Sequence, residues 1–347
     1  MLRNNNFNMI RLMAATQVLI VHGLNHLHFQ GKWVELIKIF PGVPTFFFVS
    51  GVLIFASYDR ILAQGGGLKK FWVHRVLRIY PALWVCIVTS IVLVYSAGYF
   101  HGQNISPLRF IVWLVGQASF VQFYNPEFMR GFGVGVLNGV LWTISVELQF
   151  YVLTPILYLI LKRNMCLFAF LLGFSVLANL YLRLFYDWSN MWTKLMSVSC
   201  LPWIYMFMVG GLAHVHREQF KLRVQKVGPI GMLSLYVISM QFIGSYRENA
   251  QNSINPVSFV ILTGLILWLA KAKIPLPEWV MQLIHKNDIS YGIYLYHMPI
   301  VNLVIYTGLF HSAGFVQLIF VLLVPFFCAL ASWFLIERPS LCLKTKF

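Results

Sequence analysis

Long apolar stretches separated by short polar segments run through the whole of this chain. A helix that crosses a bilayer needs about 20 predominantly apolar residues, and eleven stretches approach that length. They are residues 7–29, 40–58, 76–98, 108–124, 139–161, 165–183, 198–215, 228–244, 256–271, 289–310 and 314–336. The pattern therefore predicts an all-α, polytopic membrane protein.

The distribution of charge decides how many of these stretches are expected to cross. If all eleven crossed from a cytoplasmic N-terminus, the basic segment 216–226 would lie outside, although short cytoplasmic loops tend to carry the Lys and Arg residues. If 108–124 returns to the side from which it enters, every basic cluster lies inside, with Arg3 inside and Arg247 outside. We therefore expect about ten crossing helices, both termini in the cytoplasm, and a 108–124 segment that is either re-entrant or interfacial.

Composition agrees with a membrane protein of one domain. Hydrophobic residues make up 59% of the chain and charged residues 10%, whereas soluble domains carry about 25% charged residues. No soluble segment is visible, so a single membrane domain over 1–347 is predicted. The net charge of +16 is spread over short loops without a nucleic-acid-binding motif, so no nucleic-acid partner is expected. The same basic surface suits an anionic cytosolic ligand.

The N-terminal segment and the cysteines argue against cleavage and against metal binding. The apolar run that follows the first residues is long and has no A-x-A cleavage site, so a retained helix is expected. The five cysteines show no C-x-x-C spacing, which disfavours a disulfide framework or a zinc site. His22 and His26 have the i, i+4 spacing of paired metal ligands, but no acidic residue accompanies them, and no metal is expected.

The first apolar stretch contains Arg11 and His22, two residue types that are costly inside a bilayer. Eleven residues are close to three helical turns, so both side chains are expected on one face, about 16 Å apart. Such residues face an interior cavity or a partner by default. The alternatives are that Arg11 extends to the cytoplasmic surface and that His22 is a packed, hydrogen-bonded histidine. His26 and His28 are expected at the outer interface.

Two further motifs carry charge at or inside the membrane. Arg75 and Arg78 are i, i+3 at the predicted cytoplasmic boundary, where two guanidinium groups form a fork for phosphate. Ordinary anchoring by the positive-inside rule is the alternative. Glu147 lies among aromatic residues, where a carboxylate needs a partner, and Tyr151, a candidate for contact with a substrate, follows at i+4. Glu147 is predicted to orient or charge-balance His22 or Arg11, with a purely structural ion pair as the alternative.

Smaller signals come from two other motifs. SYGIYLYHMP places Tyr294 and His297 at i, i+3 as candidates for contact with a substrate, although an aromatic belt would also explain the tyrosines. In FFFVSGVLI, Ser50 and Gly51 are small enough to let two helices approach closely. Ser50 as a nucleophile would need a nearby base.

The motifs occur in one order along the chain: Arg-x10-His, FFFVSGVLI, HRVLRIYP, LWTISVELQFY, SYGIYLYHMP and FLIERP. In that order they resemble the acyltransferase-3 family of bacterial membrane acyltransferases over residues 10–339. The resemblance implies transfer of an acyl group, usually acetyl, from cytosolic acyl-CoA to a hydroxyl of a lipid-linked or polymeric carbohydrate such as O-antigen or exopolysaccharide. It implies the bacterial inner membrane as the location and no tightly bound cofactor. Many members carry a fused periplasmic domain, which we do not expect here.

The functional positions that the resemblance implies are Arg11, His22, Arg75, Arg78 and Glu147. We expect the acyl-CoA phosphates on Arg75 and Arg78, helped by Arg11, and His22 as the base for the hydroxyl or as a transient acyl carrier. A membrane transporter for a polysaccharide precursor or small anion is the alternative, since it also uses intramembrane Arg, His and Glu. No inverted repeat is visible to support it. A structural membrane subunit would leave Arg11 and His22 unexplained.

Overall fold

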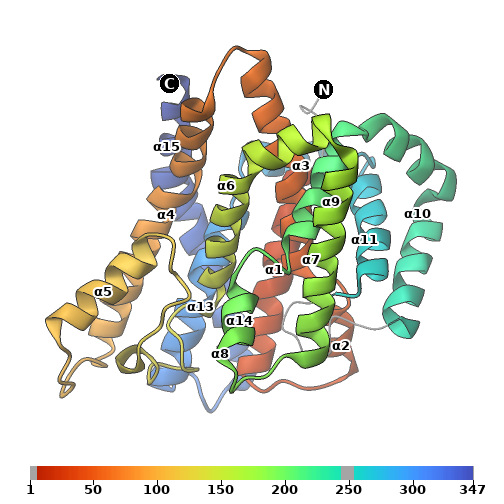
Figure 1. Ribbon diagram of the computed structural model, residues 1–347. Helices are drawn as coiled ribbons and strands as arrows, with labels where there is room; N and C mark the ends of the chain where they lie inside the picture. Colours follow the sequence, from red (N-terminus) through yellow and green to blue (C-terminus); the bar gives the residue numbers. More distant parts are fainter. Residues whose placement is uncertain (1–5, 244–253, 347) are drawn as a thin grey trace. The chain divides into compact units, whose positions relative to one another are not determined.

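The computed structural model of the protein describes residues 6–243 and 254–346. Within these two ranges all regular secondary structure is helical and there is no strand (Figure 1). This confirms the predicted all-α class. Arg3 and Arg247, which the predicted topology places inside and outside, are not among the described residues.

Each of the eleven predicted apolar stretches overlaps a helix of the structure. The helices of 18 to 29 residues are α1 (Phe7–His26), α3 (Gly42–Ala63), α4 (Leu68–Ser96), α6 (Trp142–Arg163), α7 (Met165–Phe185), α10 (Arg217–Phe242), α13 (Ser290–Thr307) and α14 (Gly314–Ser332). The shorter ones are α2 (Lys32–Lys38), α5 (Pro107–Ala118), α8 (Met191–Val198), α9 (Ile204–Val215), α11 (Pro256–Leu269), α12 (Glu278–Lys286) and α15 (Arg338–Cys342). Single turns are η1 (Glu127–Met129), η2 (Gly139–Leu141), the π-helical η3 (Trp333–Glu337) and η4 (Leu343–Lys346).

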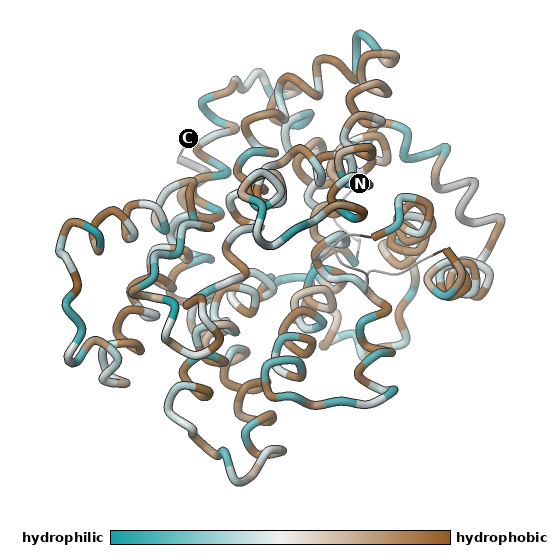
Figure 2. Tube along the Cα trace, turned by 60° about the horizontal axis from the view of Figure 1, so that its bottom comes forward, coloured by the Kyte–Doolittle hydropathy of each residue, from teal (hydrophilic) through white to brown (hydrophobic). Residues whose placement is uncertain are grey.

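Among the described residues, six helical segments are long and apolar enough to cross a membrane. They are Phe7–His26, Lys32–Ala63, Leu68–Ser96, Gly139–Arg163, Met165–Phe185 and Gly314–Cys342. Figure 2 shows hydrophobic residues running along the helices, while hydrophilic residues are frequent in the connecting segments. Helices satisfy their own backbone hydrogen bonds, which lipid cannot do for them. The chain is therefore a polytopic integral membrane protein.

The chain divides into two compact units, each assembled from three separate stretches. Unit 1 consists of Met1–Ala14, Glu35–Phe71 and Val146–Asp288, and unit 2 consists of Ala15–Val34, Trp72–Ser145 and Ile289–Phe347. Four of the boundaries between the units fall inside α1, α2, α4 and α6, and the fifth lies between α12 and α13. The single domain expected over 1–347 stays a prediction.

In unit 1, α3 and α9 pack with their backbones in contact (Figure 1). A β-carbon on Gly51 would meet the carbonyl oxygen of Phe207, and one on Gly210 would meet the backbone of Phe48 and Val52. Only glycine leaves room for this approach, which is the use that the sequence predicted for Gly51. Helix α7 packs on α9 and α11 packs on α3.

Helix α10, also in unit 1, breaks where its basic part meets its apolar part. Gly228 has φ 74° and ψ 172°, a conformation that suits only glycine, and Pro229 follows without a backbone N–H. The apolar stretch expected to begin at residue 228 therefore starts at a kink rather than at a helix end.

In unit 2, α13 packs on α14, and Gly292 allows close contact with Ala329. Asn302 of α13 is fully buried and holds the glycine-rich segment that precedes η2. Its amide oxygen accepts from the N–H of Val134 at 2.7 Å, and its nitrogen donates to the carbonyls of Val136 and Leu137 at 2.9 Å. These bonds satisfy the backbone of an irregular segment inside a membrane protein.

The length of helix α5 favours the prediction that residues 108–124 do not cross the membrane. Its 12 residues extend about 18 Å, whereas the hydrocarbon core of a bilayer is about 30 Å thick. Gln117 at its end is buried and donates to the carbonyls of Gln122 at 3.1 Å and Tyr124 at 2.8 Å. The backbone that follows α5 is thus hydrogen-bonded by protein. The choice between a re-entrant and an interfacial segment stays open.

Candidate functional site

Three imidazole rings meet in unit 2. His22 and His26 come from the last turns of α1, and His297 comes from the middle of α13. The ring centroid of His22 lies 5.6 Å from that of His26 and 5.4 Å from that of His297. His22 Nδ1 lies 3.4 Å from His26 Nε2. His22 is partly exposed, whereas His297 is 0% exposed. Across the described residues, no group of three or more His, Cys, Asp or Glu side chains is arranged to hold a metal.

The backbone of α13 fixes the tautomer of His297. Its Nδ1 lies 3.2 Å from the carbonyl oxygen of Ile293, and a carbonyl only accepts hydrogen bonds, so Nδ1 carries the proton. In the neutral ring, Nε2 then keeps a lone pair. This nitrogen is buried, and none of the residues that the structure describes is hydrogen-bonded to it. The ring of Tyr294 lies edge-on to the imidazole, with centroids 5.8 Å apart.

Arg11 forms an ion pair with Asp288, which follows α12 in unit 1. The two side chains are 19% and 11% exposed, so the pair is largely removed from water. Breaking such a pair leaves a buried charge without its counter-ion and costs about 3–5 kcal/mol. The counter-ion that the structure gives to Arg11 is therefore Asp288, a residue that the sequence did not single out. Since Arg11 and His22 both belong to α1, the helix carries them about three turns apart, as expected.

Glu147 of α6 accepts two hydroxyl hydrogen bonds within unit 1. Ser50 Oγ of α3 lies 3.1 Å from Glu147 Oε1, and the Tyr151 hydroxyl lies 2.6 Å from the same oxygen. Hydroxyl donors stabilise a carboxylate in a low-dielectric interior. Tyr151 is 2% exposed, so its hydroxyl is committed to this carboxylate. The action of Glu147 on His22 and the contact of Tyr151 with substrate stay predictions.

Arg78 forms an ion pair in unit 2 that the sequence did not predict. Its Nη1 lies 3.4 Å from Oε2 of Glu337, and its guanidinium lies 5.8 Å from the centre of the Tyr291 ring. Glu337 is almost completely buried and also accepts from Ser332 at 3.2 Å. The Arg78 guanidinium is therefore held in place by a carboxylate and by an aromatic face.

A third basic residue joins Arg75 and Arg78. Lys344 belongs to η4, just beyond the last membrane-spanning segment. Burial, followed by the positive charges of Arg75 and of Arg78, lowers the pKa of Lys344 to about 7. Two arginines and one lysine thus raise one another's electrostatic energy, which an anionic group bound among them would lower.

Tyr294, the remaining predicted residue, is buried on α13. Its hydroxyl lies 2.8 Å from that of Thr143, at the start of α6, and 3.4 Å from the carbonyl of Val140. All these residues belong to unit 2, where the bonds tie α13 to η2 and the first turn of α6. Its contact with substrate stays a prediction, as does that of His297.

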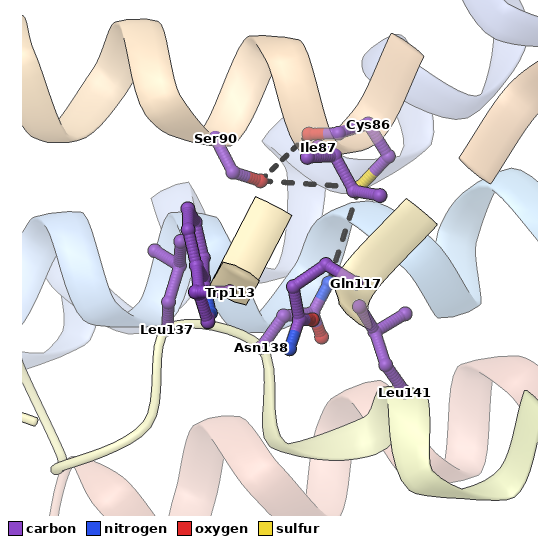
Figure 3. A pocket seen from close by; sticks show the side chains of 8 residues that line it. All are labelled: Cys86, Ile87, Ser90, Trp113, Gln117, Leu137, Asn138 and Leu141. Carbon is purple, nitrogen blue, oxygen red and sulfur yellow. Dashed lines mark hydrogen bonds between the residues drawn. The ribbon is translucent and has the colours of Figure 1, made fainter. Parts of the chain in front are cut away.

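A small cavity also lies in unit 2, between α4, α5 and the segment that leads into η2 (Figure 3). It is lined by Cys86, Ile87, Ser90, Trp113, Gln117, Leu137, Asn138 and Leu141. Pro299 has no N–H to give to the carbonyl of Leu295, and Asn138 Nδ2 donates to that carbonyl at 2.9 Å instead. The cavity has room for about one water molecule, which is too little for an acyl donor or a sugar.

Sequence reasoning missed three residues of these clusters: Asp288, Glu337 and Lys344. A usable signal was present for the two acids. The chain has only 10 Asp and Glu residues against 26 Lys and Arg, so each acid near a predicted helix end is a candidate counter-ion for an intramembrane arginine. Lys344 gave no local signal, because a basic residue near a cytoplasmic helix end is common.

Comparison with known proteins gives three informative relatives. The chain is 32% identical over 372 residues to Nodulation protein 10 of Rhizobium leguminosarum bv. viciae, covering 99% of this chain and 94% of that protein. It is 25% identical over 323 residues to Peptidoglycan O-acetyltransferase OatA of Listeria monocytogenes, covering 85% of this chain and 49% of the relative. It is 24% identical over 356 residues to the O-acetyl transferase of Shigella phage Sf6, covering 98% and 96%. No solved structure matches the chain.

These relatives confirm the resemblance found in the motifs and make the chain an enzyme rather than a transporter or a structural subunit. A family model described as an acyltransferase domain matches residues 4–336, which is nearly the whole chain. The chain therefore belongs to the acyltransferase-3 family and is a membrane O-acetyltransferase.

Proposed function

We propose that the protein transfers an acetyl group from cytosolic acetyl-CoA to a hydroxyl of a cell-surface carbohydrate. The observation that carries this proposal is the partly exposed His22, flanked by the rings of His26 and His297, on the same helix as Arg11. A histidine inside a membrane helix that is grouped with other imidazoles suits proton transfer better than packing. No tightly bound cofactor enters this chemistry.

His22 is the proposed base. The hydroxyl oxygen of the acceptor attacks the thioester carbon of the donor, and His22 takes the hydroxyl proton. The C–S bond then breaks, a C–O ester bond is left on the acceptor, and the proton passes from His22 to the CoA thiolate. In the alternative route, His22 first accepts the acetyl group and the hydroxyl removes it in a second step. Both routes require the His22 imidazole.

The proposed donor site lies on the cytoplasmic side, at Arg75, Arg78 and Lys344. CoA carries phosphate groups, and guanidinium and ammonium groups are the side chains that bind phosphate best. The mutual repulsion of the three cations supports this role, because a bound anion relieves it. The family resemblance also implies a role in donor binding for Arg11, which is ion-paired with Asp288 in unit 1.

The relatives support a carbohydrate acceptor. Two relatives are named as O-acetyltransferases, and one of these two is named for peptidoglycan, which contains sugar chains. A lipid-linked or polymeric carbohydrate such as O-antigen or exopolysaccharide is therefore the proposed acceptor. The proposed location is the bacterial inner membrane, where such an enzyme reaches a cytosolic donor and an external acceptor.

The same proposal includes a topology. We infer about ten crossing helices with both termini in the cytoplasm and α5 as the non-crossing element. The length of α5 and the side of the basic clusters support this arrangement. This topology places Arg75 and Lys344 on the cytoplasmic side of the membrane, where the proposed donor is.

Replacement of His22 by alanine tests the reaction. We expect the surface polysaccharide of cells that make only the His22→Ala variant to lose nearly all of its base-labile acetate, because both routes need the imidazole. His28→Ala is the matched control, since His28 is an exposed histidine just beyond the same helix. If His22→Ala inserts normally and the acetate content is unchanged, the proposed function of His22 is wrong.

A further inference from the structure

The lone pair of His297 Nε2 is the least explained polar group near the proposed base. It lies in a fully buried ring whose centroid is 5.4 Å from that of His22, within the range of ring contact. A buried polar atom without a partner costs free energy, and each such atom in a native protein asks for an explanation. The described residues do not supply a hydrogen bond to it.

The orientation of His297 is imposed by its own helix. The Nδ1–H bond to the carbonyl of Ile293 leaves only Nε2 to interact with a neighbour, and only as an acceptor. Tyr294, which also touches this ring, uses its hydroxyl on Thr143 and Val140. His297 is thus an acceptor held by its own helix, with its ring beside that of His22.

Such an acceptor fixes the tautomer of a neutral His22 and binds it more strongly once His22 becomes a charged imidazolium. An imidazolium has two N–H donors, and each needs an acceptor in a medium of low dielectric constant. His26 Nε2, 3.4 Å from His22 Nδ1, is one neighbour of this kind, and His297 is the other. The ionisable groups that surround His22 in unit 2 are therefore His26 and His297, with Tyr294 behind the latter.

We propose that His297 is a positioning residue for His22: its Nε2 accepts a hydrogen bond from the imidazolium that forms on His22 during acyl transfer. The bond holds one N–H of His22 while the other nitrogen takes the proton from the acceptor hydroxyl, and it strengthens when His22 becomes charged, so it stabilises the transition state more than the resting enzyme. This inference rests on the proposed function of His22. It assigns to an uncharged imidazole the role that a carboxylate plays in many catalytic triads.

The test uses two variants of similar volume that differ in the acceptor. His297→Gln keeps an oxygen that accepts hydrogen bonds, and His297→Met does not. Inverted membrane vesicles from the producing cell are supplied with radiolabelled acetyl-CoA, and base-labile label in polysaccharide is measured against donor concentration and pH. Thermal unfolding in detergent checks that both variants fold, and His297→Leu replaces the Met variant if it does not.

We expect His297→Met to lower kcat by about tenfold or more, with the KM for acetyl-CoA unchanged, since the lost bond is strongest in the transition state. The acidic limb of its pH–rate profile should move to lower pH, because the protonated His22 loses a partner. His297→Gln should recover a large part of the rate. Equal losses in the Gln and Met variants, or an unmoved acidic limb, would show a packing role and overturn the inference.

The two proposals fail in different ways. If His22→Ala retains the label transfer, the proposed function of His22 fails and the inference fails with it. If His22→Ala is inactive while His297→Met matches the wild type in kcat and in pH profile, only the inference about His297 fails.

Discussion

Lys344 has a pKa near neutrality because two arginines share its surroundings. Burial and the charges of Arg75 and Arg78 lower that pKa from 10.5 to about 7, so the ammonium group is mostly charged at pH 6 and mostly neutral at pH 8. The carboxylate of Glu337 offsets only part of the positive charge of the two arginines, because it is paired with Arg78. A phosphate bound in this cluster favours the charged form of the lysine.

The affinity for CoA should therefore fall as pH rises through about 7. We expect the Kd for CoA to increase by up to about tenfold between pH 6 and pH 8. This is the limit when binding requires the charged form of one group whose pKa in the free protein is about 7. Isothermal titration of CoA into the purified protein at each pH measures this Kd. Lys344→Arg keeps its charge throughout and should flatten the curve, whereas Lys344→Ala should bind weakly at both pH values. Parallel curves for wild type and Lys344→Ala would remove Lys344 from the donor site.

Which residue pairs with which arginine or histidine was not predictable from the sequence. The pattern identified Arg11, His22 and Arg78 as costly residues that need partners, and the structure supplied Asp288, His297 and Glu337. Asp288 is 277 residues from Arg11 and Glu337 is 259 residues from Arg78. Local periodicity carries no information about contacts so distant in the chain.

At the scale of elements, the contact of α3 with α9 depends on two glycines. Replacing Gly51 by alanine places a β-carbon against the backbone of Phe207, which cannot rotate away as a side chain can. We expect a loss of about 1–3 kcal/mol in the free energy of unfolding, from overpacking. Thermal unfolding in detergent measures it as a lower Tm.

Gly173 of α7 provides the matched control for this prediction. It lies in a helix of the same unit, and a β-carbon there would meet no atom within 4 Å. Alanine is a better helix former than glycine, so Gly173→Ala should leave the Tm unchanged or raise it. A Gly51→Ala protein as stable as Gly173→Ala would contradict the close packing of α3 and α9.

The helices themselves were predictable, and their ends less so. Apolar stretches of about 20 residues sufficed to locate the helices, because a bilayer imposes their length and composition. The expected stretch 198–215 begins at the last residue of α8 and continues as a non-helical segment over 199–203, and helix α9 starts only at Ile204. Cys200, in that segment, donates its N–H to Gln149 at 2.8 Å, a tertiary contact that hydropathy does not register.

At the scale of the molecule, the proposed topology can be tested by labelling. In a variant whose own cysteines are replaced, Arg130→Cys and Arg163→Cys each place one thiol at an exposed position. We expect a membrane-impermeant maleimide to label position 130 in intact spheroplasts and position 163 only after permeabilisation, since the positive-inside rule keeps the basic end of α6 in the cytoplasm. The opposite pattern would require α5 to cross the membrane.

The sequence by itself determined the class of the molecule, the position of its helices, the alignment of Arg11 with His22 on α1 and, through six ordered motifs, the family. These properties depend on composition, on hydrophobic runs and on short spacings, all of which are local. Only the tertiary structure decided the partners: Asp288 for Arg11, Glu337 for Arg78, and His297 beside His22. A buried charge or imidazole must find a partner wherever the packed helices offer one, and packing is a property of the folded chain rather than of any segment.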